Sequence, residues 1–139
     1  MAEAARSRNL RLLTDEEVEE RHPILLKAIA EYNEGYFFES HETLEELWLP
    51  SPWPVRSFLQ GIIQMAAAFI HLMRHEYPGT VRLLDEGIEK IAAFSGDTLS
   101  IDAGRLLAEA RSARDELAAL GPERFEEWDQ RRLPKMQLL

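Results

Sequence analysis

Cysteine is absent from the 139 residues of this chain, which excludes disulfide bonds, thiolate zinc sites and cysteine nucleophiles. Basic residues are also few, since 16 lysines and arginines stand against 25 aspartates and glutamates and leave a net charge of −9. Nucleic acids and anionic membranes bind basic surfaces, so we expect neither as a partner. The N-terminus lacks an apolar stretch followed by a small-residue cleavage site, and we therefore expect a cytoplasmic protein.

Sustained alternation of apolar and polar residues, the pattern of a β-strand, is absent as well, and we expect no strand. Apolar residues at helical spacing, with proline and glycine at the boundaries, predict an all-α bundle of five main helices: residues 23–34, 36–49, 55–77, 80–94 and 100–120. We expect one domain over residues 1–139. It would consist of an N-terminal arm (1–13), a helical core (14–120) that begins at a Thr14–Glu17 capping box, and a C-terminal strap (121–139).

The stretch 55–77 is apolar on almost every side, which is typical of a helix in the middle of a bundle. Gln60, Gln64, His71 and an arginine interrupt it, so we expect no membrane span. Buried polar groups need hydrogen-bond partners, and we expect the helix 36–49 to supply them. Gly61 costs helix stability of roughly 1 kcal/mol, and this predicts that a neighbouring helix approaches closely there.

The helix 36–49 carries the best candidates for chemistry. His41 lies within its apolar arc, which predicts that the ring faces the core, and Glu45 lies one turn later. A histidine and a carboxylate at positions i and i+4 can hold one divalent cation. Further ligands would come from Gln60, Gln64, His71 or Glu34, and an apolar pocket would be lined by Trp48, Phe38 and Tyr36.

Two functions fit this pattern. The first is a metal-dependent hydrolase that holds zinc, manganese or iron and acts on a small molecule. The second is a non-catalytic interaction or scaffold module, in which the His, Glu and Gln side chains form a structural hydrogen-bond network and the partner is a protein, including a second copy in a homodimer. The second function predicts no cavity and an exposed apolar patch, with Trp53 and Trp128 as candidates.

Three stretches together carry a family resemblance: YNEGYFFESHETLEELW, FLQGIIQMAAAFIHLMR and PGTVRLLDEGIEKI. They span residues 32–91 and resemble the uncharacterised helical family DUF309, whose H-x-x-x-E-x-x-W/Y motif is matched by His41, Glu45 and Trp48. The resemblance implies an all-helical fold and metal binding through the histidine and glutamate of that motif. The sequence departs from the family pattern at His75–Tyr77, where we expect a Gly-Asn type of turn.

Overall fold

The computed structural model describes residues 16, 20–94 and 97–138 of the chain. Its main elements are five α-helices: α3 (His22–Asn33), α4 (Phe37–Trp48), α5 (Val55–Met73), α6 (Tyr77–Ala92) and α7 (Ala103–Arg124). The prediction of an all-α bundle of five helices is confirmed. The expected N-terminal arm and capping box lie outside the described residues.

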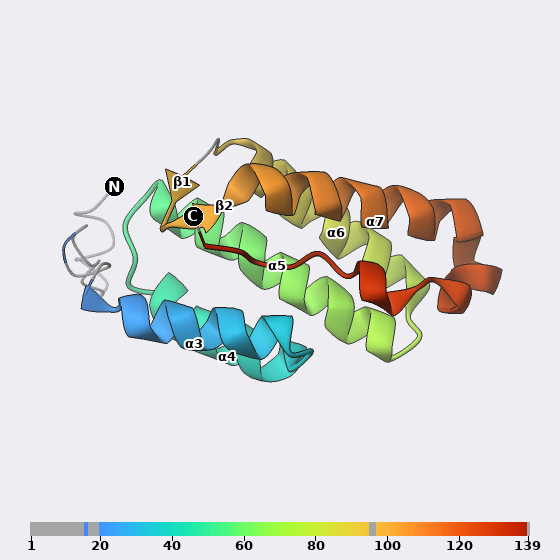
Figure 1. Ribbon diagram of the computed structural model, residues 1–139, viewed down its shortest axis with the longest axis horizontal. Coiled ribbons are helices and arrows are strands. Elements are labelled where there is room, and N and C mark those ends of the chain that lie inside the picture. Colours follow the sequence, from blue (N-terminus) through green and yellow to red (C-terminus); the bar gives the residue numbers. More distant parts are fainter. Residues whose placement is uncertain (1–15, 17–19, 95–96, 139) are drawn as a thin grey trace.

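Helix α5 lies between two helical layers, as Figure 1 shows. The α3–α4 hairpin packs on one side of it. Helix α6 packs on the other side, and α7 packs against α6. Leu59, Ile62, Met65, Ala66 and Phe69 of α5 are fully enclosed. The central position predicted for this helix is therefore confirmed. The helix ends at Met73 rather than at residue 77, because the chain turns at His75, whose φ is +59°.

Helices α5 and α6 touch through two glycines. A Cβ atom added to Gly61 would lie 3.0 Å from Ile91 Cγ1 and 3.3 Å from the carbonyl oxygen of Gly87. A Cβ atom added to Gly87 would lie only 2.9 Å from the carbonyl oxygen of Gly61. The close approach predicted from Gly61 is confirmed, and its partner is a glycine of α6.

By length and composition alone, α5 is long and apolar enough to cross a membrane. Core helices of globular bundles meet the same criteria, and most of the side chains of α5 are enclosed by its neighbours. From the sequence we expected the polar residues of this helix to exclude a membrane span. By composition alone they do not. The packing of the bundle is what accounts for the apolar character of this helix.

A short antiparallel pair, β1 (Asp97–Thr98) with β2 (Ile101–Asp102), joins α6 to α7 and corrects the expectation that the chain has no strand. Its turn residues, Leu99 and Ser100, have φ values of +55° and +62°, as in the two-residue turns of hairpins. Two residues are too few to show alternation, and the turn lacks the glycine or asparagine that usually marks such a hairpin.

Beyond α7 the chain folds back along the bundle. The helical backbone breaks at Gly121, whose φ is +76°, and two 3₁₀ turns follow, η1 (Phe125–Glu127) and η2 (Gln130–Arg132). Trp128 is only 7% exposed, and its indole N–H donates to Glu116. Trp128 is therefore a buried anchor and not the exposed patch considered from the sequence, whereas Trp53 is 48% exposed.

Candidate functional site

His41 and Glu45 lie one turn apart at the surface of α4. His41 Nε2 is 3.6 Å from Glu45 Oε1, and the two side chains are 26% and 52% exposed. The expectation that His41 faces the core is corrected. His41 falls at the edge of the inward face of α4, whose buried residues are Phe37, Ser40, Thr43, Leu44 and Leu47.

The other proposed ligands lie apart from this pair. Gln64 Nε2 donates to Glu86 of α6 over 3.2 Å, and His71 Nδ1 lies 3.0 Å from Glu76. Gln60 is half-buried on α5, and Glu34 is exposed at the end of α3. The polar stripe of α5 therefore bonds mainly toward α6 and the α5–α6 connection, and not toward α4.

A zinc site held by protein ligands needs three or four of them. Within residues 20–94 and 97–138, no three His, Asp or Glu side chains gather closely enough to hold a metal ion. The histidine and glutamate of the family motif supply only two ligands. The donor set therefore does not fit a metal site complete within the described part of the chain.

Trp48 faces the proline-rich corner between α4 and α5. The guanidinium carbon of Arg56 lies 4.7 Å from the centre of the Trp48 ring and 5.7 Å from that of Trp53. Cations are attracted to the faces of indole rings at such distances. Trp48 therefore helps to fix the corner, a contact that sequence spacing did not reveal.

Tyr36 and Phe38 line a shallow depression of about 350 Å³ where α4 begins and α5 ends. Tyr36, Phe38 and Met73 are 58%, 52% and 41% exposed. We call this surface the Tyr36–Met73 face; its lining residues are Gly35, Tyr36, Phe37, Phe38, Glu39, Ile70, Met73 and Arg74. Trp48, the third residue expected to line a pocket with Tyr36 and Phe38, is not among them. No local pattern in the sequence indicated that the end of α5 would complete this surface.

Among the described residues, the titratable group with the largest pKa shift is Tyr32, which is fully buried in the core. Burial, together with the nearby negative charge of Glu109, raises the pKa of Tyr32 far above its ordinary value. Its hydroxyl has no hydrogen-bond partner among the described residues. This phenol stays protonated at every physiological pH, so it is not a candidate acid–base group.

Residues 25–83 match the family model described as "Domain of unknown function (DUF309)". Over these residues the chain is similar to the DUF309 family. The resemblance inferred from the three sequence stretches is thereby confirmed. The matched region contains most of α3, all of α4 and α5, and the first part of α6, and therefore every ligand and pocket residue proposed from the sequence.

A protein of Bacillus subtilis (strain 168), described as "Uncharacterized protein YpuF", is 34% identical to this chain over 84 residues. The alignment covers 58% of this chain and 48% of that relative, so the chain matches about half the length of YpuF. Neither description assigns an activity. The DUF309 model does not extend to α7 and the residues that follow it.

Proposed function

We propose that this protein is a non-catalytic helical interaction module that pairs with a second copy of itself through the Tyr36–Met73 face. The observation that carries the proposal is the exposure of Tyr36, Phe38 and Met73 around one depression. Single exposed apolar residues are normal, whereas a group of them at one place is typical of an interaction site. Aromatic residues and methionine are also enriched at the centres of protein interfaces.

The charges on this face favour a second copy as the partner. Glu39 and Arg74 line the same depression with opposite signs, and neither forms an ion pair with another described residue. In a two-fold interface, residue i of one copy meets residue j of the other, and the reverse. One such axis places each Glu39 near the Arg74 of the other copy, beside the apolar contact.

Sedimentation equilibrium over a micromolar-to-millimolar concentration series tests this proposal. We expect a dimer for the natural chain and a monomer for Phe38→Asp, because the aspartate would bring an unpaired charge into the apolar contact. Leu49→Asp is the matched control, since Leu49 is 46% exposed at the other end of α4 and its replacement leaves the dimer intact.

Exchanging the charges of Glu39 and Arg74 tests the two-fold contact more specifically than the Phe38→Asp variant. Glu39→Arg alone and Arg74→Glu alone each weaken the dimer by placing like charges together, whereas the double variant restores it. A natural chain that remains monomeric over the whole series refutes the proposal. A dimer that none of these variants weakens also refutes it, because the contact then lies elsewhere.

As a second candidate we propose a two-ligand cation site on His41 and Glu45, supported by their 3.6 Å separation and partial exposure. A third ligand would come from a small-molecule substrate or another chain, and the cation would polarise a substrate oxygen for hydrolysis. Elemental analysis of protein purified without chelator, with His41→Ala and Glu45→Ala, tests this candidate. Zinc, manganese or iron is expected in the natural chain and lost in both variants. No uptake of any of the three excludes the candidate.

A further inference from the structure

The last described residues of the chain, 133–138, lie along the bundle like a bound peptide, and we call them the terminal segment. In Figure 1 this segment runs across α5 between α3 and α7. It ends beside the hairpin, where Leu138 pairs with Ile101. Pro134 and Met136 are buried, Lys135 and Gln137 are half-buried, and Leu138 is exposed. Over residues 133–137 this alternation is that of an extended chain with one face buried.

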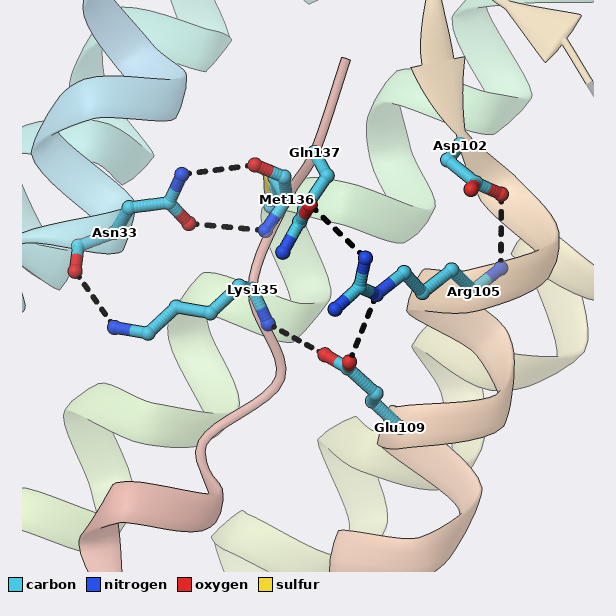
Figure 2. Close-up of polar contacts among 7 residues, drawn as sticks. All are labelled: Asn33, Asp102, Arg105, Glu109, Lys135, Met136 and Gln137. Carbon is cyan, nitrogen blue, oxygen red and sulfur yellow. Dashed lines mark hydrogen bonds and ion pairs between the residues drawn. The ribbon is translucent and has the colours of Figure 1, made fainter. Parts of the chain in front are cut away.

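Residues of α3 and α7 on either side of the terminal segment contact its main chain (Figure 2). We call the strip between these two helices, which the segment fills, the groove, and the two helices its walls. The side-chain amide of Asn33 accepts from the Met136 N–H over 2.9 Å and donates to the Met136 carbonyl over 2.8 Å. The Glu109 carboxylate accepts from the Lys135 N–H over 3.0 Å. The N–H of residue 102 donates to the Gln137 carbonyl over 2.8 Å. Main-chain contacts of this kind give affinity for an extended peptide, while pockets for alternate side chains give specificity.

Two side chains of the terminal segment also contact the bundle. Met136 is 2% exposed and packs with the buried apolar residues of the bundle core. Lys135 Nζ donates to the Asn33 carbonyl over 2.7 Å, at the negative end of the α3 dipole. These two contacts fit a lysine followed by a long apolar residue.

The groove walls hold their shape through contacts of their own. Asp102 caps α7 by accepting from the Arg105 N–H over 3.1 Å, and Arg105 pairs with Glu109 over 3.2 Å. The chain before the terminal segment has separate anchors, because Trp128 is buried and Arg132 pairs with Glu116. These contacts are made without any residue of the terminal segment.

From these contacts we infer that the groove between α3 and α7 is a recognition site for an extended peptide, which this chain fills with its own terminal segment. The partner that fits is a protein segment in extended conformation with a proline, a lysine and a methionine or leucine in succession. Such a segment binds by displacing residues 133–138. This site is separate from the Tyr36–Met73 face and uses α7, which lies outside the matched family region.

The test uses the full chain carrying Met136→Asp, which expels the terminal segment because the apolar surroundings of residue 136 reject a carboxylate. The probe is a fluorescein-labelled peptide with the sequence of residues 133–138, followed by fluorescence anisotropy. We expect saturable binding to this variant. The natural chain should bind at least tenfold more weakly, because its tethered segment competes at an effective concentration on the order of millimolar. Asn33→Ala added to the variant should lower the affinity at least tenfold.

A peptide that itself carries the Met136→Asp change is the matched control and should not bind. A folded Met136→Asp chain that shows no saturable binding at millimolar peptide overturns the inference, and so does equal binding of the control peptide. Hydrogen exchange on the natural chain keeps the inference testable if the variant fails to fold. The Lys135 and Met136 amides should exchange through a local opening. Exchange of these amides only with global unfolding overturns the inference too.

Discussion

Replacing Gly87 with alanine perturbs the contact between α5 and α6 at its tightest point. The added Cβ would meet the carbonyl oxygen of Gly61 at 2.9 Å and the backbone nitrogen of Met65 at 3.4 Å. Both are backbone atoms of α5, so no side-chain rotation relieves the overlap. One helix has to move away from the other, and the fully buried residues between them, such as Ile91 and Phe58, lose contact.

Two opposing effects set the size of the change. Alanine gains about 1 kcal/mol over glycine in the interior of a helix. Overpacking of a core costs roughly 1–3 kcal/mol, and the upper part of that range applies because the obstacle is backbone. We therefore expect Gly87→Ala to lower the free energy of unfolding by about 1–2 kcal/mol. For a chain of this size, that corresponds to a fall in Tm of roughly 4–8 °C.

Urea denaturation followed by circular dichroism measures this change, and Gly104→Ala is the control. Gly104 is exposed in the first turn of α7, and a Cβ there would meet only Asp102 Oδ1, at 3.8 Å. The control should gain up to about 1 kcal/mol, since propensity acts without a clash. Gly87→Ala as stable as the natural chain, or more stable, would refute the argument that these helices pack backbone to backbone.

Three further perturbations probe the core and the C-terminal anchor. Tyr32→Phe removes a buried hydroxyl that has no partner in the described part of the chain, so stability should stay the same or rise by about 1 kcal/mol in thermal melts. A loss of that size would reveal a bound water. Ser40→Ala removes the hydrogen bond from Ser40 Oγ to the Ala28 carbonyl and should cost about 1 kcal/mol in urea titrations. Hydrogen bonding from Arg132 lowers the pKa of Glu116, so its contribution to stability is present above the ordinary carboxyl pKa and is lost as the pH falls through the lowered value. Glu116→Gln should therefore show a weaker acid dependence of stability, and an unchanged pH profile would contradict this assignment.

Local sequence signals were sufficient for the helices and their order. The apolar periodicity of α3 and α4, together with Gly35 between them, depends on contacts within a few residues, and those contacts are the same in any fold that contains the hairpin. Gly61 also carried long-range information. A glycine inside an apolar helix lowers helix stability, so its presence suggests that another helix packs closely against it. Helix α6 packs against Gly61 in this way. The family segment was recognisable for the same reason, because its motifs lie within continuous stretches of sequence.

The tertiary structure alone decided which side chains meet. His41 lies only one position from the buried stripe of α4, and the rotation of that helix against α5 placed it at the edge. Gln64 found its partner on α6, a choice between two neighbouring helices that spacing along one helix cannot make. The Asn33–Met136 contact joins residues 103 positions apart. No local pattern encodes such a pair, because only the packing of α3 and α7 on opposite sides of α5 creates the groove that holds it.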